Sequence, residues 1–263
     1  MSTKTIVLIH GLFVNPASWA GWKACFENAG YTCHTPAYPF HEGTPASRWE
    51  SVDPGLARLD LKTVTAHLQQ FIDQLPEKPI LIGHSMGGLL TQILINEGRG
   101  VAGVCIDSAP PQGIFTAAWS FLRWNLPVIN PLAGNSVFYP TVEWFHGAFC
   151  NTMSLTETRQ EFDQFVVPES RNIPLSSTMS AGKVDFRKPH APLLFIAGER
   201  DTIVPASLNR RNFNAYRDTN SRREFKEFPG RSHYICGQPG WEEVTGFVLE
   251  WVRGCEVSKL VSK

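Results

Sequence analysis

Apolar residues along the chain fall into two alternating patterns. Short continuous runs, such as Thr5–Ile9 and Pro79–Ile82, are typical of strands that are covered on both faces of a sheet. Longer stretches with apolar residues near helical spacing lie between such runs, for example Leu56–Leu75, which Pro76 ends. Strands that alternate with helices form βαβ crossovers, so the pattern predicts an α/β fold with a mostly parallel sheet.

The other expected elements continue the same alternation on either side of one long gap. The remaining predicted strands are 31–38, 101–106, 193–197 and 223–228, and the remaining predicted helices are 18–29, 86–96, 206–216 and 241–253. From Ala109 to Lys188 the chain is rich in proline and aromatic residues, with helical pieces but no clear strand. We therefore expect a core of residues 1–108 and 189–263, interrupted by a helical cap insertion of residues 109–188.

The net charge limits the classes of binding partner to expect, and the cysteine pattern indicates a cellular compartment. The chain has 263 residues with 24 Lys and Arg against 24 Asp and Glu, so its formal net charge is zero. That balance argues against nucleic acid and anionic membranes as partners. No apolar run reaches the length of a spanning helix, and the apolar run near the N-terminus is too short for a secretory signal. The six scattered cysteines form no C-x-x-C pair, so we expect free thiols and a cytoplasmic location.

The sequence Gly83-His-Ser-Met-Gly-Gly88 follows a predicted strand and opens a predicted helix. In that context G-x-S-x-G indicates a nucleophile elbow, a tight turn that exposes the Ser85 hydroxyl at the edge of the sheet. The beginning of the helix also places backbone N–H groups beside developing negative charge. Ser85 is therefore the candidate nucleophile.

His10-Gly-Leu-Phe13 lies at the carboxyl end of the first predicted strand. One interpretation is purely structural: a glycine turn with a packed histidine. The functional one is a loop beside the elbow that helps to hold an oxyanion, which needs N–H groups from more than one direction. We expect the Leu12 and Met86 amides to be these donors. Phe13 is an alternative donor and a candidate wall of the acyl pocket.

An acid and a base follow later in the chain, each after a predicted strand. Asp201 comes after the strand at 193–197, and His233 comes after the strand at 223–228. A serine needs a base to attack an acyl carbon at neutral pH, and the base needs a carboxylate to fix its tautomer. Asp107, at the end of the strand 101–106, is the alternative acid. We favour Asp201.

These motifs together resemble the α/β-hydrolase-fold serine hydrolases of the esterase and lipase kind, whose order of residues is Ser, Asp, His. The resemblance implies a sheet of about six parallel strands flanked by helices and a cap in the 109–188 insertion. It also implies a triad of Ser85, Asp201 and His233 that needs no cofactor. Aromatic residues of the insertion, Trp119 and Trp124 among them, are candidates to line a substrate pocket with Phe13.

The predicted activity is hydrolysis of carboxylic esters of small to medium apolar substrates, with a small-molecule ester as the partner. A lactonase, thioesterase, amidase or carbon–carbon bond hydrolase would use the same triad. A ligand-binding receptor that kept the fold without turnover is the alternative from another class. The remaining histidines show no metal-ligand spacing, so we expect no metal site.

Overall fold

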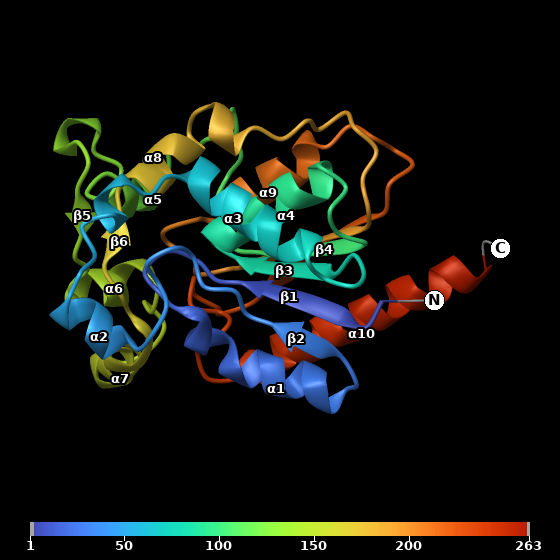
Figure 1. Cartoon of the computed structure of the whole chain (residues 1–263), viewed down its shortest axis with the longest axis horizontal. Helices are drawn as coiled ribbons and strands as arrows, with labels where there is room; N and C mark the ends of the chain where they lie inside the picture. The colour runs from blue at the N-terminus through green and yellow to red at the C-terminus, as the bar shows by residue number, and fades with distance from the viewer. Residues whose placement is uncertain (1–2, 262–263) are drawn as a thin grey trace.

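The computed structural model describes residues 3–261, with side chains described as far as Cys255. Within this range the main sheet has six strands, all parallel, in the order β2-β1-β3-β4-β7-β8 (Figure 1). In chain order these strands are β1 (Thr5–Ile9), β2 (Thr32–His34), β3 (Ile80–His84), β4 (Ala102–Ile106), β7 (Leu193–Gly198) and β8 (Arg223–Phe228). The predicted fold class, with about six parallel strands, is confirmed.

Helices pack on both faces of this sheet (Figure 1). One face is covered by α1 (Ala20–Asn28) and α10 (Trp241–Val261), and the other by α3 (Leu61–Asp73), α4 (Met86–Asn96) and α9 (Ala206–Ala215). Successive side chains of β1 alternate between the two cores: Ile6 and Leu8 pack on the α1 face, and Val7 and Ile9 on the α4 face. Covered faces on both sides explain why the strands appear in the sequence as uninterrupted apolar runs.

Several predicted elements have other bounds in the structure than the sequence pattern indicates. The predicted helix at 56–75 divides into a 3-10 turn, Leu56–Arg58, and α3, because the Asp60 side chain accepts the Thr63 amide at 2.8 Å and starts a new helix. The predicted helix at 18–29 begins as a 3-10 turn, Pro16–Trp19. Of the predicted strand at 31–38, only β2 pairs with the sheet.

Residues 109–188, called here the 109–188 segment, contain short helices and one strand pair. The helices are α5 (Trp119–Asn125), α6 (Val142–Ala148), α7 (Leu155–Phe165) and α8 (Asn172–Ser177), with 3-10 turns at Pro131–Ala133 and Ser180–Gly182. The expectation of no strand there was wrong, since β5 (Val137–Phe138) pairs antiparallel with β6 (Glu169–Ser170). Strands of two residues are too short to leave a periodic pattern. A further short helix, α2 (Pro45–Glu50), was not predicted.

The 109–188 segment is joined to the core loops by backbone hydrogen bonds. The Val167 amide donates to the Phe13 carbonyl at 2.9 Å, and the Tyr234 amide donates to the Phe149 carbonyl at 2.9 Å. The segment therefore contacts the loops after β1 and β8, at the carboxyl edge of the sheet.

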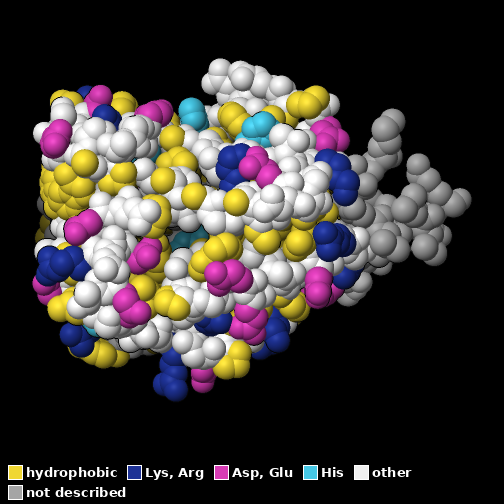
Figure 2. All heavy atoms as spheres, turned by 90° about the horizontal axis from the view of Figure 1, so that it is seen from below, with side chains coloured by type: hydrophobic (Ala, Val, Ile, Leu, Met, Phe, Trp, Pro, Cys, Tyr) yellow, Lys and Arg dark blue, Asp and Glu magenta, His cyan; other side chains and the backbone are white. Residues whose placement is uncertain are grey.

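The outer surface of the 109–188 segment carries several large apolar side chains. Figure 2 shows hydrophobic side chains gathered at the end of the molecule where β5 and α5–α7 lie in Figure 1. The segment contributes these exposed large hydrophobic side chains: Phe115, Trp119, Leu126, Leu132, Tyr139, Leu155 and Met179. Among the described residues, no helix combines the length and the apolar character needed to cross a membrane.

Candidate active site

Ser85 occupies the sharp turn between β3 and α4. Its backbone has φ 56° and ψ −118°, a conformation that residues with a Cβ rarely adopt. The glycines of the motif are required by close backbone approach. A Cβ on Gly83 would lie 2.0 Å from the carbonyl oxygen of Gly87, and one on Gly87 would lie 2.1 Å from that of Ile9. The G-x-S-x-G sequence therefore folds as the tight turn that its pattern predicts.

The loop after β1 lies directly beside this turn. A Cβ on Gly11 would approach the Cβ of Ser85 to 3.0 Å, so a larger residue would press the two loops apart. Leu12 and Met86, the predicted oxyanion donors, line one cavity together with Ser85. His10 stays outside the cavity lining, because its ring packs on Tyr38 with the centroids 3.9 Å apart.

His233 and Asp201 form a buried hydrogen-bonded pair. The distance from His233 Nδ1 to Asp201 Oδ2 is 2.6 Å, and both side chains are fully buried. The other oxygen of Asp201 accepts the amides of Ile203 and Val204 at 2.9 and 2.8 Å. Burial lowers the pKa of His233 to about 3, which keeps the imidazole neutral. Its Nε2 has no hydrogen-bond partner among the described residues, so the Nε2 lone pair remains available to accept a proton.

Asp107, the alternative acid, lies next to Asp201 rather than in its place. Its Oδ1 accepts the Gly198 amide at 2.7 Å, and its backbone has a positive φ of 42°. Burial, together with the charge of Asp201, raises the pKa of Asp107 well above its usual value, and burial also raises the pKa of Asp201. Two carboxyl groups in contact do not both ionise readily. Asp201 accepts three N–H donors and Asp107 one, which favours the proton on Asp107.

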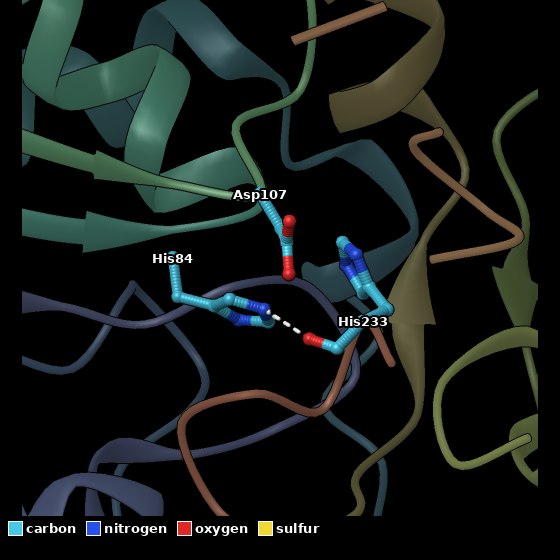
Figure 3. Close-up of side chains that lie close together, drawn as sticks. All are labelled: His84, Asp107 and His233. Atoms are coloured by element: carbon cyan, nitrogen blue, oxygen red, sulfur yellow. Dashed lines mark hydrogen bonds between the residues drawn. The ribbon is translucent and has the colours of Figure 1, made fainter. Parts of the chain in front are cut away.

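The structure also brings together three groups that the sequence analysis did not connect. Ligand atoms of His84, Asp107 and His233 lie within 4.8 Å of one another. Figure 3 shows the Asp107 carboxyl group directed toward the two imidazole rings. His84 Nε2 donates to the carbonyl oxygen of His233 at 2.7 Å, and burial, with His233 nearby, lowers the pKa of His84 to about 3. A metal ion at this cluster would compete with hydrogen bonds that already hold the His233 loop.

A cavity of about 250 Å³ opens beside Ser85, between the core and the 109–188 segment. The core contributes Leu12, Phe13, Ser85, Met86, Ile203 and Val204 to its walls, and the segment contributes Ala109–Pro111, Gly113–Phe115, Phe121, Asn125, Val128, Ile129, Phe149, Pro174, Ser177 and Thr178. Phe13 thus lies where the sequence analysis expected it, on the cavity wall.

The two tryptophans proposed as pocket residues are not part of this lining. Trp119 is 75% exposed, and the ring of Trp124 packs over Gly147, where a Cβ would lie 2.1 Å from it. Phe121 and Asn125 of the same helix line the cavity instead. Helix α5 has only seven residues, too few for the sequence to show which of its faces is turned inward.

Sequence reasoning also missed Phe149. Its ring meets the His233 imidazole edge-on, with the centroids 4.7 Å apart, and it lines the Ser85 cavity.

One further contact crosses from the core to the 109–188 segment. His41 Nε2 lies 3.0 Å from Glu169 Oε2, and both side chains are buried. Neither residue belongs to a motif, so no local signal marked them.

Comparison with known proteins identifies the family. The model of the alpha/beta hydrolase family matches residues 6–243, and the chain therefore belongs to that family. Comparison with curated protein sequences finds no significant match.

Several solved structures share the fold. A monoacylglycerol lipase of Paleococcus ferrophilus is similar over 97% of this chain and 96% of its own, with a TM-score of 0.69 and 19% identity. An extracellular alpha/beta-hydrolase from a Paenibacillus species covers 94% and 98%, with a TM-score of 0.68 and 20% identity. A pyrethroid hydrolase from Sphingobium faniae covers 96% and 98%, with a TM-score of 0.66 and 17% identity. The protein is accordingly a hydrolase of the alpha/beta fold with lipases and esterases among its structural neighbours.

Proposed function

We propose that the protein is a serine hydrolase that cleaves carboxylic esters of small to medium, mainly apolar substrates. The observation that carries this proposal is the state of His233. One ring nitrogen is held by Asp201 at 2.6 Å, and the other is neutral, buried and without a partner among the described residues. Such an imidazole is oriented to take a proton at Nε2. Ser85, exposed by its turn into an apolar cavity, is the group that supplies it.

The reaction divides into two acyl transfers. In the first, the Ser85 hydroxyl gives its proton to His233 Nε2 while Oγ bonds to the ester carbonyl carbon. The Leu12 and Met86 amides stabilise the resulting oxyanion. The carbon–oxygen bond to the alcohol then breaks, and the alcohol leaves with the proton from Nε2. In the second transfer, water gives a proton to Nε2 and attacks the acyl-enzyme, and Ser85 regains its proton as the carboxylic acid leaves.

The environment of Asp201 supports its role as the orienting acid. Asp201 Oδ2 accepts a hydrogen bond from the His233 Nδ1–H group, and two backbone amides donate to its other oxygen. Asp107 lacks that set of donors. We therefore assign Asp107 to supporting Asp201 rather than to contacting the base. The thiols of Cys25, Cys33, Cys105, Cys150 and Cys236 form no disulfide, which favours the expected reducing compartment, the cytoplasm.

Labelling with a fluorophosphonate, followed by intact-mass measurement, tests the nucleophile. The wild type should gain one label, Ser85→Ala should gain none, and Ser207→Ala, which removes an exposed serine of α9, should label like the wild type. Ser85→Ala should also abolish ester hydrolysis, as should His233→Ala, because the groups act as a unit. Wild-type turnover by Ser85→Ala would overturn the proposed function.

A pair of isosteric variants tests the acid. Asp201→Asn should lower kcat by a factor on the order of 10³–10⁴, since the amide no longer fixes the tautomer of His233. Asp107→Asn should be mild, because a neutral side chain of the same shape already matches a protonated carboxyl. The opposite ranking would move the acid to Asp107 and leave the rest of the mechanism in place.

A further inference from the structure

The walls of the Ser85 cavity are uncharged. Among the described residues that line it, no Asp, Glu, Lys, Arg or His occurs, and the polar side chains are those of Ser85, Asn125, Ser177 and Thr178. A charged group on a substrate would lose its hydration in this cavity without finding an ionic partner. The cavity therefore favours neutral ligands over ions of either sign.

The amide of Asn125 has already used its hydrogen-bond donors. Its Nδ2 donates to the Phe121 carbonyl and to the Ile203 carbonyl, each at 2.9 Å. These two carbonyl partners also fix which end of the amide is nitrogen. The carbonyl Oδ1 is consequently the polar atom of this lining side chain that these two bonds leave available, and it can only accept a hydrogen bond.

The hydroxyl groups of Ser177 and Thr178, which also line the cavity, likewise donate to backbone carbonyls. Ser177 Oγ donates to the Pro174 carbonyl at 2.8 Å, and Thr178 Oγ1 donates to the Leu175 carbonyl at 2.7 Å. Each hydroxyl proton is therefore engaged with the backbone around α8, and each oxygen keeps only acceptor capacity. Asn125 is the last residue of α5, Ser177 is the last residue of α8 and Thr178 follows it, and all three line the same cavity.

The cavity thus has a directional hydrogen-bonding pattern. The proposed donors, the Leu12 and Met86 amides, lie at the Ser85 end and match an ester carbonyl. The acceptors lie on walls that α5 and α8 provide. A ligand that fills the cavity satisfies both ends when it has a carbonyl at one and an O–H or neutral N–H at the other.

We propose that the Ser85 cavity selects compact, neutral esters that carry a hydroxyl group on the part facing Asn125. This proposal rests on the proposed function, and it deepens it by naming the substrate class. The cavity volume of about 250 Å³ lies below the roughly 300–1,000 Å³ that is common for ligand pockets, so the cavity favours a hydroxylated ester with a short carbon chain over long acyl chains and bulky ring systems.

An isosteric series of methyl esters tests the proposal on the wild-type protein. Methyl 3-hydroxybutanoate, methyl 3-methylbutanoate and methyl 3-aminobutanoate place a hydroxyl, a methyl or an ammonium group at the same position of the same acyl chain. Each kcat/KM is divided by the rate constant of hydroxide-catalysed hydrolysis of that ester, which removes differences in intrinsic reactivity. The hydroxyl ester should exceed the methyl ester by about 2- to 10-fold, the range of one neutral hydrogen bond. The ammonium ester should be slowest, by more than about 10-fold.

Variants of Asn125 locate the acceptor. Asn125→Leu should bring the ratio of hydroxyl to methyl ester to about 1, whereas Asn135→Leu, an exposed asparagine of the same segment, should leave it unchanged. Asn125→Asp keeps the shape but adds a negative charge, so it should raise kcat/KM for the ammonium ester relative to the hydroxyl ester by at least about 10-fold. This second variant tests the position even where the leucine variant fails to fold.

The outcomes separate this proposal from the proposed function. Hydrolysis of all three esters at similar normalised rates, or a hydroxyl preference that persists in folded Asn125→Leu, would overturn the proposed substrate class alone. An absence of hydrolysis of any ester together with an unlabelled Ser85 would overturn the function itself.

Discussion

Replacing Ser85 by glycine is expected to stabilise the protein relative to Ser85→Ala, although neither variant can transfer an acyl group. The reason is the backbone of Ser85, with φ 56° and ψ −118°. Holding a residue with a Cβ in such a conformation costs about 1–3 kcal/mol, which alanine also bears and glycine escapes. Glycine gives back about 0.5–1 kcal/mol of this through its larger loss of backbone entropy on folding. The expected net advantage of glycine over alanine is about 1 kcal/mol.

A second pair of variants isolates the strain. Ser207 is an exposed residue in the first turn of helix α9, so there glycine should be less stable than alanine by up to about 0.5–1 kcal/mol, the penalty of a helix interior. Subtracting the glycine–alanine difference at Ser207 from that at Ser85 cancels the entropy of glycine and leaves about 1–3 kcal/mol of strain. Urea unfolding followed by circular dichroism measures all four free energies of unfolding. For a chain of this length, 1 kcal/mol also corresponds to a Tm shift of about 2 °C.

If the two glycine–alanine differences are equal, or if Ser85→Gly unfolds more easily than Ser85→Ala, the turn at Ser85 stores no strain. The tight turn would then reflect only the close approach of the flanking glycines.

Three further predictions concern stability and pH. Gly87→Ala should lower the free energy of unfolding, measured in urea, by more than about 2 kcal/mol, because its Cβ would lie 2.1 Å from a carbonyl oxygen of β1. The control is Gly246→Ala, whose Cβ would meet nothing within 4 Å, so this variant should be neutral or stabilising. Because burial lowers the pKa of His233 to about 3, kcat/KM should change little between about pH 7 and pH 5 and should fall toward pH 3. A midpoint of the activity profile near the ordinary histidine pKa of about 6.5 would contradict this. Burial disfavours the charged form of His41, but Glu169 outweighs it and raises its pKa, so the ion pair stabilises the fold at low pH and its contribution is lost as pH rises through the pKa of folded His41. Glu169→Gln should therefore destabilise the protein more at about pH 6 than at pH 9, by roughly 3 kcal/mol at the lower pH, in urea unfolding; equal losses at both pH values would refute a charged pair.

The parts of the fold that the sequence predicted are those whose signal is local. The parallel strands appear as apolar runs because helices cover both faces of the sheet, and the turn at Ser85 appears as spaced glycines because backbone atoms pass within 2.0–2.1 Å of where a Cβ would be. The ends of the helices and strands were less predictable. Asp60 begins a new helix inside a continuous apolar pattern, since a side-chain cap competes with helix propagation.

The candidate site shows the same division. Asp201 and His233 could be proposed from their places after strands, and the structure holds them at 2.6 Å. The cavity wall could not be assigned correctly, because Phe121 and Phe149 reach it through packing between segments distant in sequence. Trp119, chosen for its residue type, is instead largely exposed. A short helix without a clear amphipathic pattern does not reveal which residue faces inward.

Phe149 contacts both the substrate cavity and the proposed catalytic base. Its ring is a wall of the Ser85 cavity and also an edge-on neighbour of the His233 imidazole, and its carbonyl holds the amide of Tyr234. A substrate group that is too large for the cavity would press on this ring, and any displacement of the ring would turn the base away from Ser85. Oversized esters would then still bind but react slowly. Selection by size would consequently appear in kcat more than in KM, as a loss of alignment in the transition state rather than a loss of affinity.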